Sequence, residues 1–146
     1  MPPYSIHYHT YVAGKNNNPV TGDAFRHLLK NCSLGQRRPT DDMICTNGMI
    51  DNSNLIISAW EENSEGKQLI GIARAMTDFH YACYLSDLAV HNDYQRKGVG
   101  KKLIENTTKA IQKKCKVILL AAPNANEYYA PLGFDNNPRG WVLNNE

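Results

Sequence analysis

The chain has 146 residues, of which 42% are apolar and 21% charged, and its 16 basic and 14 acidic side chains leave a net charge of +2. This length predicts a single domain over residues 1–146, and so small a net charge argues against a nucleic-acid-binding protein. No run of residues reaches the roughly 18 apolar side chains of a membrane-spanning helix. Because the four cysteines also lack CxxC spacing, we expect a reduced, cytoplasmic protein with no membrane or nucleic-acid partner.

The N-terminal third predicts one strand and two helices. Residues 4–12 alternate in the manner of a strand, with His7 and His9 on one face. Two histidines without a third nearby ligand favour a surface pair over a metal site, so no metal is expected. A first helix is predicted to start at Pro19, and a second helix is predicted to follow an N-cap at Thr40.

The middle of the chain predicts an antiparallel meander, because apolar runs at residues 55–60, 68–76 and 82–90 are separated by short polar turns. A helical pattern through Ile111 and a strand at residues 116–120 follow. A strand, a helix and a strand in succession form a crossover, so the later strand should run parallel to the one that ends at Val90. The fold class is therefore a mixed α/β sheet. The remaining residues predict a short helix at 124–130 and a last strand at 141–143.

A glycine turn between the strand and the helix is the centre of the functional argument. The turn reads Gln95-Arg96-Lys97-Gly98-Val99-Gly100, with Lys101 after it. Glycines leave backbone N–H groups uncovered, and a helix N-terminus attracts anions, so the turn predicts a diphosphate site. A P-loop is excluded because Gln95 and Lys102 occupy positions that need glycine and Ser or Thr, and a dinucleotide fingerprint fails at Leu103.

With the strand end Leu88-Ala89-Val90, this turn, and Tyr129 followed by Gly133-Phe134, the sequence resembles the GNAT superfamily of acetyl-CoA-dependent N-acetyltransferases. The resemblance implies a sheet splayed between the strands at Val90 and Val117. It implies that the pantetheine arm of acetyl-CoA pairs with Leu88, Ala89 and Val90, and that the diphosphate rests on the amides of residues 95–101. Amide groups in the arm suit pairing with a strand edge.

The resemblance also implies direct attack of a primary amine on the acetyl thioester within one ternary complex. In this family a tyrosine four residues before the Gly-Phe pair protonates the departing thiolate, which assigns Tyr129 as general acid; the alternative is a packed aromatic. Tyr128 is the adjacent candidate, but it is expected in the core or on the surface. Bases in this family often lie on the strand before the turn, where Tyr84 and Ser86 share a face. Asp87 is a third base candidate, but strand alternation points it the other way unless a bulge intervenes, which favours a structural hydrogen-bond acceptor. Asp78 and His80 could act through water.

Several assignments stay open at this stage. Cys83 is interpreted as a buried inert thiol and not as an acyl-enzyme nucleophile, and Asn126 is either a cofactor contact or a polar residue at a helix start. Acceptor pockets in this family come from segments that correspond here to residues 19–52 and 135–141. The alternative function is a non-catalytic, regulatory acyl-CoA-binding module, and homodimerisation is left open by the expected last strand.

Overall fold

The computed structural model describes residues 5–145, apart from the side chains of Asn124 and Asn126. A five-stranded sheet has the order β1-β2-β3-β4-β5 and comprises β1 (Ser5–Val12), β2 (Leu55–Asn63), β3 (Gly66–Thr77), β4 (Ala82–Val90) and β5 (Lys116–Ile118). The first four strands are antiparallel neighbours, and β5 is parallel to β4. The predicted mixed sheet, with its meander and its parallel crossover, is therefore confirmed.

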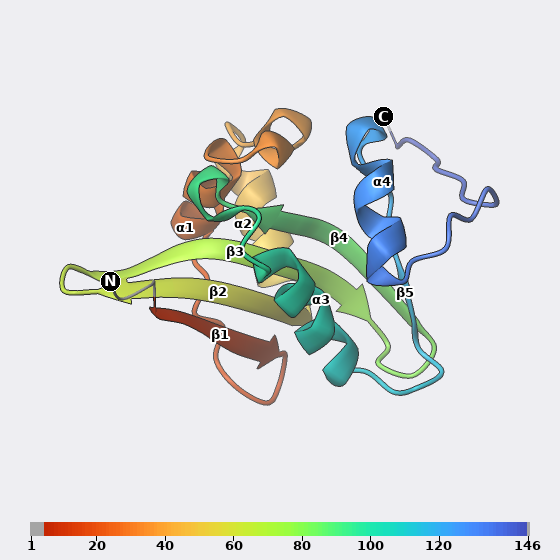
Figure 1. Cartoon of the computed structure of the whole chain (residues 1–146), viewed down its shortest axis with the longest axis horizontal. Coiled ribbons are helices and arrows are strands. Elements are labelled where there is room, and N and C mark those ends of the chain that lie inside the picture. Colours follow the sequence, from red (N-terminus) through yellow and green to blue (C-terminus); the bar gives the residue numbers. More distant parts are fainter. Residues whose placement is uncertain (1–4, 146) are drawn as a thin grey trace.

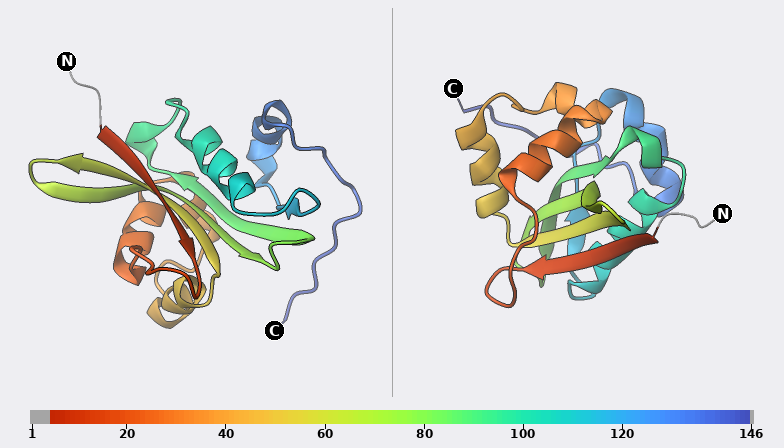
Figure 2. Two further views of the ribbon diagram at one scale, coloured as in Figure 1. Left: turned by 90° about the horizontal axis from the view of Figure 1, so that it is seen from below. Right: turned by 90° about the vertical axis from the view of Figure 1, so that its left-hand side faces the viewer.

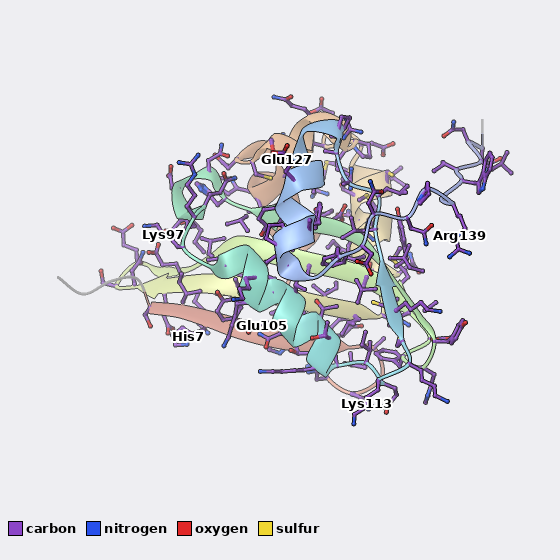
Figure 3. All side chains as sticks on the ribbon, turned by 45° about the vertical axis from the view of Figure 1, so that its right-hand side comes forward. His7, Lys97, Glu105, Lys113, Glu127 and Arg139 are labelled. Carbon is purple, nitrogen blue, oxygen red and sulfur yellow. The ribbon has the colours of Figure 1, made fainter. Side chains whose placement is uncertain are left out.

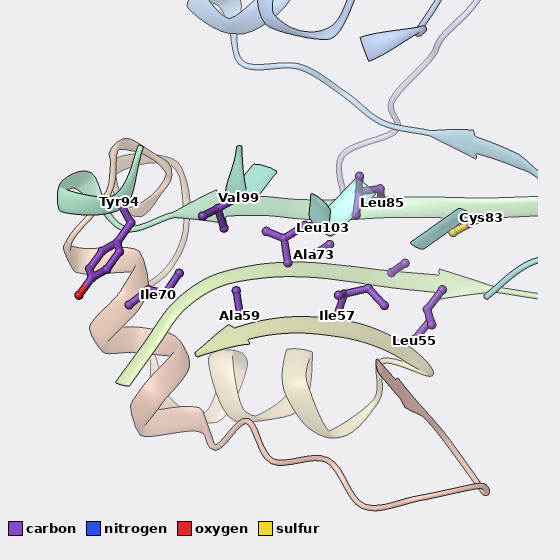
Figure 4. Close-up of a cluster of buried hydrophobic side chains, with 11 residues drawn as sticks. Leu55, Ile57, Ala59, Ile70, Ala73, Cys83, Leu85, Tyr94, Val99 and Leu103 are labelled. Carbon is purple, nitrogen blue, oxygen red and sulfur yellow. The ribbon is translucent and has the colours of Figure 1, made fainter. Parts of the chain in front are cut away.

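Helices cover both faces of this sheet (Figures 1 and 2). One face carries α3 (Val99–Lys109), whose Val99 and Leu103 pack into a core formed with Leu55, Ile57 and Leu85 of the strands (Figure 4). The opposite face carries α1 (Gly22–Lys30) and α2 (Met43–Asp51) over a second core, with the 3-10 turn η1 (Ser33–Arg37) between them. Apolar strand residues alternate between the two cores because successive side chains point to opposite faces.

The helix starts differ from those predicted. Thr21 caps α1, since its hydroxyl accepts from the Ala24 N–H at 3.1 Å, so the helix begins after Pro19 and not at it. Asp42 caps α2 in place of Thr40, and its carboxylate accepts from the Cys45 N–H at 2.9 Å. An aspartate satisfies the same orphan N–H groups as threonine and adds a negative charge at the positive end of the helix.

Beyond β5 the chain forms only short elements, namely the 3-10 turn η3 (Pro123–Ala125), α4 (Asn126–Tyr129) and the 3-10 turn η4 (Ala130–Leu132), with η2 (Asn92–Tyr94) between β4 and α3. The strand predicted at residues 141–143 is wrong: those residues form no ladder, and the side chains of Trp141 and Leu143 are 93% and 95% exposed. A strand needs a partner, and an apolar triplet cannot specify one. Of the helices in the described part of the chain, none is both long and apolar enough to cross a bilayer.

Candidate active site

The sheet opens between β4 and β5. Parallel pairing joins Ala82, Cys83 and Tyr84 to the three residues of β5, and there β5 ends, whereas β4 continues to Val90. On this last part of β4 the side chains of Leu88 and Val90 pack on the α3 side and that of Ala89 packs on the α1 side. The outer edge of residues 85–90 therefore extends past the end of β5 and has no ladder partner on that side among the described residues.

The glycine turn lies at the end of this open edge. Gly98 is the N-cap of α3 in the left-handed conformation, with φ +81°, and Arg96 is also left-handed, with φ +63°. Gly98 contributes no side-chain cap, so the first N–H groups of α3 are not satisfied in that way. Successive backbone N–H groups in such turns form anion-binding concavities. Gln95, by contrast, points back: its amide donates to the Val90 carbonyl at 3.1 Å and stabilises the turn.

Tyr128 reaches from α4 into this turn. A Cβ on Gly100 would lie 2.1 Å from the Tyr128 hydroxyl oxygen and 3.9 Å from Val90 Cγ2. The phenol thus rests on the first turn of α3, beside the end of β4. Figure 3 shows α3 and α4 side by side over the sheet, with Lys97 at the turn that precedes α3. Glycine at position 100 is what leaves room for this contact.

A β-bulge decides to which face of the sheet the polar side chains of β4 point. Ala75 pairs with Leu85 and Arg74 pairs with Asp87, so Ser86 is the extra residue. Regular alternation would place Asp87 on the face opposite Tyr84 and Ser86. The bulge reverses the alternation and brings Asp87 onto their face, toward α1 and α2.

Asp87 is fully buried between two guanidinium groups. Its Oδ1 accepts from Arg38 Nε at 2.6 Å and its Oδ2 accepts from Arg74 Nε. Arg74 also donates to the hydroxyls of Ser53 and Ser86, each at 2.9 Å. With both carboxylate oxygens engaged by arginines, Asp87 is arranged as a counter-ion for Arg38 and Arg74.

The ring of Tyr129 is in edge-to-face contact with that of its neighbour Tyr128, at a centroid distance of 5.2 Å and an interplanar angle of 84°, and also packs edge-on against Phe134. Burial raises the pKa of Tyr129, Tyr128 adds to that rise, and the charge of Arg38 opposes it. The two tyrosines of α4 thus have different further neighbours: the Tyr128 hydroxyl contacts the glycine turn, and the charge of Arg38 acts on Tyr129. The side chain of Asn126 lies outside the described residues.

The remaining candidates, Cys83, Asp78 and His7, have environments that do not favour a catalytic or metal-binding role. Burial raises the pKa of Cys83, which disfavours the thiolate. Asp78 caps the turn between β3 and β4, where hydrogen bonds from the Tyr81, Ala82 and His80 N–H groups lower its pKa to about 2. The side chain of His7 pairs with Glu62 at 3.4 Å. In the described part of the chain, no three His, Cys, Asp or Glu side chains are grouped as for a metal ion.

Comparison with known proteins places this geometry in a family. The family model for the acetyltransferase (GNAT) domain matches residues 52–136, which include β2 to β5, the glycine turn and α4. The chain belongs to the GNAT acetyltransferase family. An uncharacterised N-acetyltransferase, ycf52, from Gracilaria tenuistipitata is 34% identical over 93 residues, which cover 62% of this chain and 51% of that protein. The chain thus matches about half the length of this curated relative.

Solved GNAT-like structures share the fold across the whole chain. A probable acetyltransferase from meticillin-resistant Staphylococcus aureus superposes with a TM-score of 0.72 at 17% identity, covering 97% of this chain and 99% of the other. An aminoglycoside N-acetyltransferase in complex with CoA superposes with a TM-score of 0.65 at 16% identity, covering 99% and 97%. At these identities the likeness shows the fold alone.

Two residues of this GNAT site, Arg38 and Arg74, were not predicted from the sequence, and Tyr128 was predicted only as an alternative to Tyr129. Arg74 had a signal, since it is the one charge in the apolar run 69–76 and Asp87 is the one carboxylate in the neighbouring strand. Two such charges on adjacent strands predict a buried pair. Arg38 gave no local signal, because its partner is 49 residues away in the sequence. The tyrosine pair was visible, but which ring faces the glycines depends on where α4 lies.

Proposed function

We propose that this chain is an acetyl-CoA-dependent N-acetyltransferase that acetylates a primary amine of a small molecule or peptide by direct attack in a ternary complex. The observation that carries the proposal is the open edge of β4 ending in a left-handed glycine turn at the N-terminus of α3. An extended, amide-bearing chain with an anionic end fits this combination, because the edge supplies backbone pairing partners and the helix end supplies N–H donors. The CoA complex of an aminoglycoside N-acetyltransferase with this fold supports the choice of ligand.

In this proposal Leu88, Ala89 and Val90 pair with the pantetheine, and the amides of residues 95–101 hold the diphosphate. Arg96, Lys97 and Lys101 add positive charge around the turn. The Tyr128 hydroxyl lies on Gly100, so it either moves or becomes a ligand when the diphosphate binds. Acetyl-CoA supplies the acetyl thioester; the protein contributes alignment of the thioester along β4.

We assign Tyr129 as the general acid. The amine nitrogen forms a bond to the thioester carbon, the C–S bond breaks, and the thiolate takes the phenolic proton. Burial raises the pKa of Tyr129, which keeps the phenol protonated at neutral pH and available as a donor. A leaving thiol with a pKa near 8.5 gains from such a donor at pH 7.

We propose that the amine loses its proton to water rather than to a carboxylate. Both oxygens of Asp87 are held by arginines, and the Ser86 hydroxyl accepts from Arg74. An alkyl amine with a pKa near 10 is neutral in about one part in a thousand at pH 7, which corresponds to ~4 kcal/mol. Turnover at limiting amine should therefore rise with pH up to the pKa of the amine.

Thiol release from acetyl-CoA in the presence of a panel of primary amines tests the proposal. Amine-dependent release of CoA, with the acetyl group recovered on nitrogen, is the expected result. Binding of CoA in calorimetry with no release for any amine would favour the regulatory acyl-CoA-binding module, which the engagement of both Asp87 oxygens by arginines also suits. No binding of CoA would overturn both assignments.

The cytoplasmic location and the homodimer stay predictions. All four cysteines are free thiols in the structure, and two of them, Cys32 and Cys83, are buried. Free thiols of this kind are typical of a reducing compartment.

A further inference from the structure

Arg38 connects the segment before α2 to the bulge of β4. Its Nε donates to Asp87 Oδ1 at 2.6 Å, one terminal nitrogen donates to the Ser86 carbonyl at 2.7 Å, and the other donates to the Arg37 carbonyl at 2.9 Å. Its side chain is only 21% exposed. All three guanidinium nitrogens thus donate to acceptors within the protein.

The two partners on β4 are the residues that the bulge displaces. Ser86 is the extra residue, and Asp87 is the residue that the bulge turns toward α1 and α2. The extra residue of a bulge loses its place in the ladder. Arg38 donates to the Ser86 carbonyl and is a second cation for Asp87 beside Arg74. Its hydrogen bonds therefore stabilise the bulge.

The segment that Arg38 anchors lines an open cavity of about 700 Å³. Its lining residues are Arg38, Pro39, Thr40, Asp41, Asp42, Met43 and Ile44. Within the described part of the chain, the hydrogen bonds that link residues 33–42 to the sheet all come from Arg38. Arg38 is thus the hydrogen-bonded link between this segment and β4, beside the apolar packing of Leu34 on the core under α1.

The same side chain lies close enough to Tyr129 for its charge to act on that phenol, against the effects of burial and of Tyr128. Arg38 accordingly connects two parts of the site, the cavity that it lines and the bulge that it binds. We propose that Arg38 is a positioning residue that fixes the cavity of residues 38–44 as the amine-binding wall, in register with the thioester end of β4. This inference rests on the proposed acetyltransferase function.

The experiment compares Arg38→Met and Arg38→Lys with the matched control Arg37→Met, whose side chain is exposed. For Arg38→Met we expect the KM for the amine to rise about tenfold or more, which is about 1.4 kcal/mol, while the KM for acetyl-CoA stays within a factor of two. Arg38→Lys keeps the positive charge opposite Asp87 but loses the fork that reaches Ser86, so it should show a smaller rise in the same parameter. Arg37→Met should match the wild type.

A readout that needs no turnover separates this inference from the proposed function. Hydrogen exchange at the amides of residues 40–46 should quicken by about 10- to 100-fold in Arg38→Met, while the amides of residues 99–104 keep their protection. Arg38→Lys covers the case in which Arg38→Met does not fold. A wild-type chain that acetylates no amine would refute the proposed function alone. Unchanged amine KM and unchanged exchange in both Arg38 variants, or an equal loss of affinity for CoA and amine, would overturn the role of Arg38.

Discussion

Replacing each glycine of the turn by alanine should have a different effect: the change at Gly98 should lower thermal stability, and the change at Gly100 should lower CoA affinity. Gly98 has φ +81° and open space around its Cβ position, so Gly98→Ala introduces backbone strain and no clash. A non-glycine residue in the left-handed region costs about 1–2 kcal/mol, and at about 4 °C per kcal/mol the Tm should fall by roughly 4–8 °C. Gly14→Ala is a matched control for the backbone strain, because Gly14 has φ +84° and equally open surroundings but lies in the turn after β1.

Gly100→Ala should instead preserve stability and weaken CoA binding. Gly100 lies within α3, where alanine is favoured over glycine by up to about 1 kcal/mol. Its new Cβ would lie 2.1 Å from the Tyr128 hydroxyl oxygen, which sits at the far end of a half-exposed side chain and can move. In the complex the methyl group would stand where the diphosphate is proposed to lie, so we expect CoA affinity to fall about tenfold or more.

Tyr128→Phe separates the contact of the new methyl group with the Tyr128 hydroxyl from its contact with the diphosphate. Without the hydroxyl, the nearest ring carbon is 3.4 Å from the Cβ position of Gly100. In the double variant the contact with Tyr128 is relieved, while the loss of CoA affinity persists. Thermal unfolding and calorimetry with CoA measure both quantities. Wild-type CoA affinity in Gly100→Ala, or full recovery of affinity in the double variant, would refute the placement of the diphosphate on this turn. A Gly98→Ala variant as stable as the wild type would refute the strain argument.

Three further predictions concern titratable groups. Asp87→Asn removes one member of a buried ionic cluster and should lower the free energy of unfolding by about 3–5 kcal/mol in urea titrations; a loss of kcat at unchanged stability would contradict the counter-ion role and support a base. Tyr129→Phe should lower kcat about 100-fold, and the wild-type rate should lose the acid only at a pH above the ordinary pKa of tyrosine, because burial raises the pKa of Tyr129. Tyr81→Phe, in the exposed turn before β4, is its control, and equal rates in both variants would exclude the proposed acid. NMR titration of Asp78 should give a pKa of about 2. Since this value lies below that of the unfolded chain, the stabilising contribution of Asp78 is present above about pH 4 and is lost as the pH falls through 2. An ordinary pKa, or an unchanged acid-unfolding profile in Asp78→Asn, would count against the turn cap.

The periodic parts of the chain were predictable because their signals are local. Apolar runs at residues 55–60, 68–76 and 82–90, separated by short polar turns, predicted the meander, and the helical repeat after Gly98 predicted α3 and the parallel crossover. The glycine turn was readable for the same reason, since φ values above zero and an uncapped helix start follow from glycine itself. The strand predicted at residues 141–143 was wrong, because a short apolar run does not specify the strand with which it would pair.

The sequence alone determined the order of the elements from β1 to β5, the glycine turn between β4 and α3, and the spacing of Tyr129 before Gly133. Only the tertiary structure decided which polar groups meet: the bulge at Ser86 turned Asp87 to the other face, Arg38 reached it from 49 residues away, and Tyr128 covered Gly100. The physical reason is that a bulge arises from the pairing of two strands, and a contact between distant segments depends on the packing of whole layers. Neither is encoded in the period or the propensity of any single stretch.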